Sequence, residues 1–428
     1  MNRVSSSKLL LAPLGIVLFG IVVLLAKKHA LGVPSPQTLL TGVDWSFAPW
    51  LGLAIVLALF IQVLLIRAQA DSWLFPIALT LASVGAVEIG RLKAALFAPQ
   101  LRWLCIALVV YVLVLRLGRT WQRLLAYPYL LGLVCVVVLG LPMLFGTEIG
   151  GSKNWLVLGP LSVQPSEFGK ILILFFLAAY LSDHRQVLTT AKRHLLCLRL
   201  PPLRFIAPLI CIWGLAVLMF VVEKDLGSAL LFFGIAVLMT YMATGSKSYV
   251  FLAFAFFGLA AVVSYMLFGH VRVRVAIWLN PWSDPNGMAY QVVQSLFAFG
   301  TGGIWGTGFG FGHPGFIPEV HTDFIYAAVA EEWGLVGALM VFICYVLFFW
   351  RGIRIALACQ EERTALLAAG CASLLLLQAF IIVAGVTKFL PLTGITLPFV
   401  SYGGSSLVSC FVLLGILTTL STGRRAHE

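Results

Sequence analysis

Ionisable residues inside apolar stretches are the first places where this sequence could do chemistry. Glu167 and Lys170 lie three residues apart at the start of an apolar run, so on a helix they would share one face and could form an ion pair. Glu331 and Glu332 are adjacent, well inside a second apolar run. Charged groups at such depth are costly and usually mark a functional pathway. A structural ion pair or polar contacts between helices would explain them equally well.

The most pointed candidate is Asp323, where a glycine-rich stretch meets the apolar run 323–350. It lies in the segment 318–324, which reads PEVHTDF. A carboxylate in that place could serve as a general base. It could equally do no more than favour the positive end of a helix that Thr322 caps. Position alone leaves both interpretations open.

Two further polar motifs precede apolar runs. Asp225, in the triplet 223–225 (EKD), could cap the helix that follows it. The segment 397–406, which includes Ser401, combines two glycines with four hydroxyl groups at a helix start. Such a start could bind an anion through backbone N–H groups, or its small residues could simply pack helices together. Acidic, basic and hydroxyl groups therefore gather at helix ends, which suits an enzyme or a transporter that handles a polar head group.

The elements that must position these residues are membrane-spanning helices. Of 428 residues, 61% are hydrophobic and only 10% are charged, against about 25% charged in a soluble domain. This composition excludes a disordered polymer, a coiled coil and a secreted disulfide scaffold. The runs do not alternate as the strands of a membrane β-barrel do. The fold class predicted is an all-α polytopic membrane protein.

Twelve apolar runs are long enough to span a membrane. Their approximate limits are 9–26, 47–66, 73–89, 101–117, 124–146, 165–182, 205–222, 226–244, 249–269, 323–350, 365–387 and 396–420. The first run follows Arg3 and Lys8 like a signal peptide, but no small-residue cleavage site comes after it, so we interpret it as an uncleaved span.

The distribution of basic residues predicts that both termini are cytoplasmic. With that orientation, inside segments hold 17 Lys and Arg and outside segments hold 9, in agreement with the positive-inside rule. The richest inside loop is 183–204. The formal net charge of +12 therefore reflects topology and does not indicate nucleic-acid binding. The eight cysteines show no metal-binding spacing and no disulfide framework.

One outer loop, 270–322, is far longer than a connector between helices. Residues 288–299 within it are too short to span and predict a helix lying at the membrane interface. Eight glycines follow within 300–315, as in a backbone that must approach something closely. A long loop of this kind is usually functional.

Several motifs in this order resemble the SEDS (shape, elongation, division and sporulation) proteins, the FtsW/RodA group. The resemblance covers about residues 73–420. The segments that carry it are 151–155 (GSKNW), 164–170 (QPSEFGK), 225–228 (DLGS), 280–291, 318–324 and 398–406.

The resemblance implies a peptidoglycan glycosyltransferase that polymerises lipid II at the outer face of the bacterial cytoplasmic membrane. It also implies a class B penicillin-binding protein as the transpeptidase partner, besides lipid II and membrane lipids. The family usually has ten spans, so residues 1–72 are expected to be an N-terminal two-helix addition to a glycosyltransferase domain at 73–428. Glu223-Lys224 and the apolar 380–382 region depart from the family pattern.

The resemblance places the family's essential acidic residue on Asp323, and its polar cavity pair on Glu167 and Lys170. The other predicted substrate-binding residues are Lys153, Arg272, Arg274, His321, Thr322, Lys388 and Ser401. Joining two lipid II units needs a base for the attacking hydroxyl and positive charge for the departing pyrophosphate. Arg and Lys could supply that charge, as could a divalent cation such as Mg²⁺ or Mn²⁺, for which the sequence identifies no ligands.

Two other function classes remain as alternatives. A lipid II flippase or another transporter could use the same polar groups for passage across the membrane. A non-catalytic scaffold of the cell-wall synthesis machinery would need neither Asp323 nor the glycine-rich loop. Incubation of the purified protein with labelled lipid II separates the three classes, because the product is polymer, translocated lipid or neither.

Overall fold

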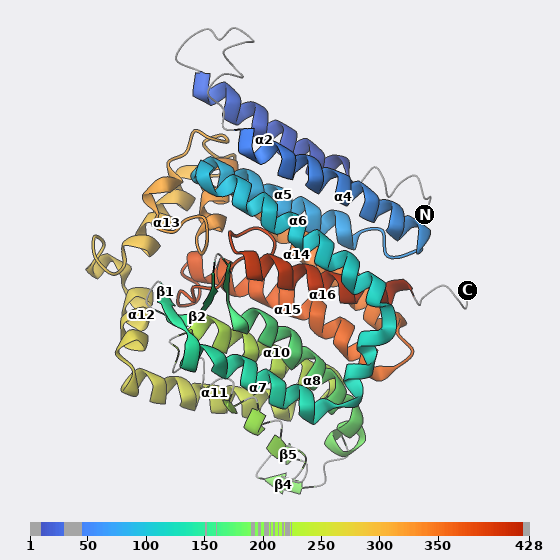
Figure 1. Cartoon of the computed structure of the whole chain (residues 1–428). Helices are drawn as coiled ribbons and strands as arrows, with labels where there is room; N and C mark the ends of the chain where they lie inside the picture. The colour runs from blue at the N-terminus through green and yellow to red at the C-terminus, as the bar shows by residue number, and fades with distance from the viewer. Residues whose placement is uncertain are drawn as a thin grey trace.

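The protein is a bundle of long helices with little sheet, seen in the computed structural model (Figure 1). The structure describes residues 10–29, 45–149, 152–159, 161–189, 193–195, 198–200, 205, 207–208, 210–212, 214–215, 218, 223 and 225–422. The helices are α2 (Leu11–His29), α4 (Ala48–Arg67), α5 (Leu74–Leu92), α6 (Phe97–Leu117), α7 (Pro128–Phe145), α8 (Pro165–Thr189), α10 (Leu226–Thr244), α11 (Lys247–Leu267), α12 (Gly269–Leu279), α13 (Tyr290–Gly302), α14 (Ile325–Ala358), α15 (Glu362–Val386) and α16 (Gly404–Thr422).

The strands are short and lie in two of the connections. β1 (Thr147–Ile149), β2 (Ser152–Leu158) and β3 (Leu161–Val163) form an antiparallel sheet in that order between α7 and α8. β4 (Arg193–Leu195) pairs antiparallel with β5 (Leu198–Leu200). Short 3₁₀ helices complete the connections: Gly118–Ala126 has nine residues, and Trp45–Phe47, Ala94–Leu96, Pro281–Ser283 and Pro314–Phe316 have three each.

The predicted spans agree with the helices. Ten helices in the described part of the chain are long and apolar enough to cross a membrane, and α2 coincides with the first predicted run. Local signals set several ends: Pro128 and Pro165 begin α7 and α8, where a missing N–H costs nothing. Gly245 ends α10 in the left-handed conformation. The predicted span 205–222 falls mostly outside the described residues.

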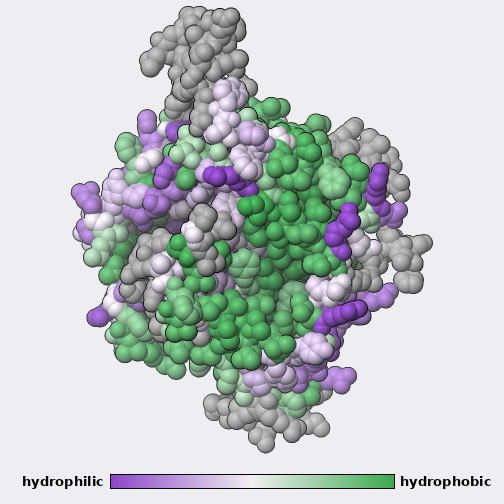
Figure 2. All heavy atoms as spheres, in the orientation of Figure 1, coloured by the Kyte–Doolittle hydropathy of each residue, from purple (hydrophilic) through white to green (hydrophobic). Residues whose placement is uncertain are grey.

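Segments predicted to share one side of the membrane do meet on one side. At the end of the bundle predicted to be cytoplasmic, Arg363 Nη2 lies 2.7 Å from Asp183 Oδ1, and Arg185 Nη1 lies 2.9 Å from Glu362 Oε1. Asp71 pairs with Arg351 at the same end. Figure 2 shows a hydrophobic band between two more polar edges, and α12 and α13 lie toward the left edge in Figure 1. Which of these two faces is cytoplasmic stays a prediction.

The outer loop 270–322 contains more helix than the sequence predicts. Its opening residues, including Arg272 and Arg274, form α12. The interfacial helix predicted at 288–299 is α13, which packs against α14. The loop is therefore an ordered cap over the outer end of the bundle.

The two N-terminal helices pack on the outside of the bundle, α2 against α5 and α4 against α6. The approach of α2 is close: a Cβ added at Gly20 would lie 2.4 Å from Cγ1 of Val87. The domain boundary between residues 72 and 73 remains a prediction.

Sidedness can be measured with single engineered cysteines in a background that lacks reactive native cysteines. Asn286 and Glu361 are both exposed, on opposite ends of the bundle. We expect a membrane-impermeant thiol reagent to label Asn286→Cys in intact cells, and Glu361→Cys only after the membrane is opened. The reverse pattern would show that the predicted orientation is inverted.

Candidate active site

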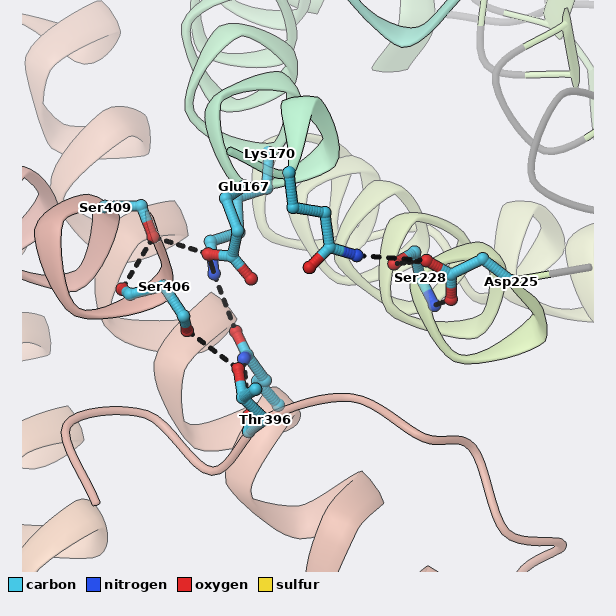
Figure 3. A network of polar contacts seen from close by, with 9 residues as sticks. Glu167, Lys170, Asp225, Ser228, Thr396, Ser406 and Ser409 are labelled. Atoms are coloured by element: carbon cyan, nitrogen blue, oxygen red, sulfur yellow. Dashed lines mark hydrogen bonds and ion pairs between the residues drawn. The ribbon is translucent and has the colours of Figure 1, made fainter. Parts of the chain in front are cut away.

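The predicted pair of Glu167 and Lys170 forms, and it is buried. Lys170 Nζ lies 2.5 Å from Glu167 Oε2, and both residues come from the first turns of α8 (Figure 3). Only 2% of Lys170 is exposed. The i, i+3 spacing therefore produces the ion pair that the sequence indicates, directed into the bundle and away from lipid.

Four other side chains extend this pair into a closed ring of polar contacts. Lys170 Nζ donates to Gln378 Oε1 of α15 at 3.1 Å, and Gln378 Nε2 donates to the carbonyl oxygen of Thr396 at 2.8 Å. The hydroxyl groups of Thr396 and Ser406 lie 2.7 Å apart. Ser409 donates to Glu167 Oε2 at 2.5 Å, which returns the chain of contacts to α8. The ring joins α8, α15, α16 and the segment before α16.

A second cluster surrounds Asp225 at the start of α10. Asp225 Oδ1 accepts from the backbone N–H of Ser228 at 3.0 Å, which confirms the predicted helix cap. Asp225 Oδ2 also accepts from Ser228 Oγ, from Asn154 Nδ2 at 3.2 Å and from Gln164 Nε2 at 3.4 Å. The β2–β3 hairpin therefore carries two amide side chains to this carboxylate. Figure 3 shows the Asp225 cluster beside the Glu167 pair.

Asp323 lies in the turn before α14, partly buried, at the end of the bundle predicted to face outside. Burial raises the pKa of its carboxyl group from 3.8 to about 6, and the nearby Arg274 guanidinium and the Thr322 hydroxyl oppose that rise. Arg274 also interacts with the charge of Asp225. The two carboxylates from separate parts of the chain therefore share one arginine.

The backbone that follows α15 holds Arg274 in this place. Arg274 Nη1 donates to the carbonyl oxygens of Leu392 and Thr393, each at 3.2 Å. The adjacent Gly394 has a φ of +72°, and a Cβ added there would lie 3.6 Å from Asp323 Oδ2. The segment 392–394 therefore lies beside both Arg274 and Asp323.

The predicted cap of α14 by Thr322 is wrong. The residue at the cap position of α14 is Phe324, and no side chain caps that helix. Thr322 Oγ1 donates to the carbonyl oxygen of Glu319 at 2.8 Å instead. Asp323 lies one residue before the cap position, and its interaction with the positive end of α14 stays a prediction, as does its catalytic role.

Three of the other predicted residues lie beside Asp323. Ser401 Oγ donates to the carbonyl oxygen of Thr322 at 2.5 Å, and the Tyr402 N–H donates to that of His321 at 2.9 Å. His321 Nε2 lies 3.6 Å from Glu319 Oε2. These contacts tie the segment before α14 to the segment before α16.

The remaining predicted residues lie further from this group. Lys388 Nζ donates to the carbonyl oxygen of Leu279 at 3.5 Å, at the end of α12. Arg272 is exposed on α12, one turn or less from Arg274. The backbone of Lys153 belongs to β2, and its side chain lies outside the described residues. Their substrate-binding roles stay predictions.

Several polar residues at the site escaped the sequence reasoning. Gln378 is a lone amide within an apolar run and carries no motif. The sequence predicts Asp225 only as a helix cap, although its segment belongs to the motifs of the resemblance. Among the described residues, Asn154 Oδ1 and Glu223 Oε1 are buried without a hydrogen-bond partner. Burial and the neighbouring Asp225 raise the pKa of Glu223 to about 8.

The chain is similar to known proteins in sequence and in fold. The family model for cell cycle proteins of the FtsW/RodA/SpoVE type matches residues 64–426. The chain belongs to this family. A relative from Mycobacterium tuberculosis, named peptidoglycan glycosyltransferase RodA, is 40% identical over 400 residues, which is 90% of this chain and 85% of the relative. Stage V sporulation protein E of Bacillus subtilis is 35% identical over 71% of this chain and 79% of its own length.

Solved structures of the family share the fold. A chain from a peptidoglycan synthase complex, in a structure about the coordination of polymerization and crosslinking, matches with a TM-score of 0.67 and 28% identity. It covers 84% of this chain and 99% of its own length. The rod shape determining protein RodA of Thermus thermophilus matches with a TM-score of 0.57 and 26% identity, over 83% of this chain and 98% of its own.

The buried ion pair predicts strongly non-additive effects on stability. Lys170→Met leaves the Glu167 carboxylate buried without its partner, which should lower the free energy of unfolding by about 3–5 kcal/mol. Adding Glu167→Gln should recover most of that loss, because no uncompensated charge remains. Thermal unfolding of the detergent-solubilised single and double variants measures this. Additive losses in the double variant would contradict a mutual pairing.

Proposed function

We propose that the protein is a peptidoglycan glycosyltransferase that polymerises lipid II into glycan strands at the outer face of the cytoplasmic membrane, in cell elongation or division. The observation that carries this proposal is Asp323: a carboxyl group with a pKa of about 6, free of any capping role, at the mouth of a helical bundle. A group that titrates near neutral pH is suited to accept a proton during catalysis. The name of the Mycobacterium tuberculosis relative, peptidoglycan glycosyltransferase RodA, agrees with this activity.

Asp323 is the general base in this proposal. The hydroxyl group of one sugar attacks the anomeric carbon of another, and the hydroxyl proton passes to the Asp323 carboxylate. The bond between the anomeric carbon and the pyrophosphate oxygen breaks, and the lipid pyrophosphate leaves with the electron pair. A base at the outer mouth can meet a hydroxyl group that arrives from outside while the lipid chains stay in the membrane.

Arg274 is the cation best placed to balance the charge of the departing pyrophosphate. Its guanidinium is held on two backbone carbonyl oxygens and so is oriented before substrate arrives. A divalent cation such as Mg²⁺ or Mn²⁺ is a further candidate. No group of three or more His, Cys, Asp or Glu side chains that could hold a metal occurs in the described part of the chain. Such an ion would therefore be held mainly by substrate phosphates.

The unpartnered oxygens beside Asp225 suit a sugar. Asn154 Oδ1 and Glu223 Oε1 are buried polar atoms that would gain from contact with hydroxyl or amide groups of the glycan. The Glu167–Lys170 ring lies next to this cluster and keeps α8, α15 and α16 in register around it. We expect the substrate head group to lie between these polar groups and Asp323.

A class B penicillin-binding protein is the partner that would crosslink the strands. Support comes from the fold match to a chain of a peptidoglycan synthase complex. We also propose that both termini are cytoplasmic, because the positive-inside rule favours that orientation and it places Asp323 outside.

Transport and scaffolding are the competing functions. Labelled lipid II in proteoliposomes distinguishes them from polymerisation, since a flippase moves the lipid without extending it and a scaffold does neither. The buried Glu167–Lys170 ring is the feature that would favour a transporter, because polar groups deep in a bundle often line a pathway.

Asp323→Asn tests the base directly. Asn keeps the shape of the side chain but cannot accept the proton, so polymerisation should fall by about 10²–10⁴-fold. Folding should be little affected, because Asp323 caps no helix. Polymerisation of lipid II by the purified variant with its partner is the measurement. Activity close to wild type would leave Asp323 without a catalytic role.

The pKa of Asp323 also predicts the pH dependence of polymerisation. The base acts as a carboxylate, so kcat/KM should fall as pH drops through about 6. Arg274→Gln removes the positive charge that opposes the raised pKa, and the acid limb should therefore move to higher pH. Arg274→Lys keeps the charge and is the matched control. An acid limb that does not move in Arg274→Gln would show that Asp323 does not control it.

A further inference from the structure

The glycine-rich stretch after α13 is docked into a break in α14. The N–H groups of Thr307 and Gly308 donate to the carbonyl oxygens of Glu331 and Glu332, each at 3.0 Å. In the other direction, Leu335 N–H donates to Gly303 at 2.9 Å. The loop backbone therefore pairs with helix backbone along two turns of α14.

Two glycines make this close approach feasible. Gly334 interrupts α14 with a φ of +69°, and a Cβ there would lie 2.3 Å from the backbone nitrogen of Gly306. Gly306 has a φ of +84°, and its own Cβ would lie 2.2 Å from the carbonyl oxygen of Glu332. Any side chain at either position would push the two backbones apart.

Buried charges hold the far side of the same loop. Glu332 Oε2 accepts from the Gly310 N–H at 3.0 Å, and Glu331 Oε1 accepts from the His313 N–H at 2.7 Å. Arg91 at the end of α5 pairs with Glu332 at 2.9 Å and donates to the carbonyl oxygen of Gly312 at 2.8 Å. The loop is thus fixed in height relative to α5 and α14.

The depth of the loop in the membrane can be measured along α14, starting from the ion pair of Arg351. Arg351 pairs with Asp71 at the connection between α4 and α5, which marks the inner edge of the bundle. Val336, whose N–H donates to Ile304, lies about 22 Å from Arg351 at 1.5 Å per residue. A hydrocarbon core is about 30 Å thick, so the backbone at Ile304 lies within its outer part. Asp323 precedes Ile325, where α14 begins, and so lies beyond Val336 along the chain from Arg351.

The side chains at this height are large, apolar and exposed. Trp305 is 80% exposed and Ile304 is 60% exposed, although the backbone that carries them is fixed. Leu335, Leu339 and Ile343 of α14 form an exposed apolar face that continues from the loop toward Arg351. Apolar exposure that is continuous with a lipid-facing helix surface indicates lipid as the covering phase.

We propose that the tip of this loop, Gly303–Gly306, inserts Ile304 and Trp305 into the outer leaflet of the membrane. Tryptophan is enriched at that depth, where its ring is apolar and its N–H remains near the head groups. Non-helical backbone at membrane depth requires that its polar groups be satisfied by protein. Here α14 accepts from the N–H groups of Thr307 and Gly308 and donates to the carbonyl oxygens of Gly303 and Ile304, while Glu331, Glu332 and Arg91 bind the backbone of residues 310–313. The insertion anchors the segment that runs from the loop to Asp323 at a set distance from the lipid surface.

Photo-crosslinking tests the contact without reference to catalysis. The photo-crosslinking amino acid p-benzoylphenylalanine replaces Trp305 in one variant. In two control variants it replaces Leu339, on the lipid-facing side of α14, or Glu319, near Asp323. All three residues are exposed in this structure. After irradiation of the full chain in membranes with its partner present, mass spectrometry identifies the adducts. We expect phospholipid adducts at 305 and 339, and few at 319. Adducts of 305 with the partner protein, or a lipid yield at 305 no higher than at 319, would overturn the proposal.

Loop variants give an independent readout. With the photo-crosslinker at position 304, Trp305→Lys should reduce the lipid adducts, whereas Trp305→Phe should retain them. Gly334→Ala should also reduce them by forcing the loop off α14, with folding checked by thermal unfolding. Retention of lipid adducts in folded Trp305→Lys and Gly334→Ala would show that docking and the aromatic ring do not set the contact. Because the readout is lipid contact, it stands or falls separately from glycosyltransferase activity.

Discussion

The structure depends on one constraint: inside a membrane, every buried polar group must find a partner within the protein. An unsatisfied group in hydrocarbon costs several kcal/mol, because no water is present to replace the missing contact. The Glu167–Lys170 ion pair meets this constraint by adding Gln378 and Ser409 as further partners. The result is a ring that ties three helices together from inside, so that polar contacts specify the packing that apolar side chains alone would leave less well defined.

The same constraint bears on Asp323, the base that we propose. Asp323 is only partly buried, yet burial is enough to raise its pKa to about 6. Arg274 prevents a larger rise and is itself held by the carbonyl oxygens of the segment after α15. A base that is neutralised too strongly would not accept a proton, and one that is fully solvated would be too weak. Asp225, which shares the same arginine, is satisfied by its own cap and amide partners.

Features that depend only on neighbouring residues could be predicted from the sequence. The apolar runs predicted the helices, and the i, i+3 spacing predicted the Glu167–Lys170 pair. Position alone could not separate a cap from a base at Asp323, because both need a carboxylate at a helix start. The contact of Arg274 with the charges of Asp225 and Asp323 could not be predicted either, since it depends on how α10, α12 and α14 pack. The partners of Glu331 and Glu332 are loop N–H groups and Arg91, none of which is close to them in sequence.

The break in α14 at Gly334 positions the glycine-rich loop. Gly334 is not helical and so interrupts the backbone hydrogen bonds of α14. The loop backbone forms hydrogen bonds with the residues on either side of this break. This exchange fixes the loop to the stretch of α14 that is level with the end of α5. Because the chain runs from that loop directly to Asp323, the height of the carboxylate follows from the same contacts. The base that we propose would act on a substrate anchored by its lipid, and it would therefore need a constant height relative to the membrane. A loop fixed to a spanning helix supplies that height.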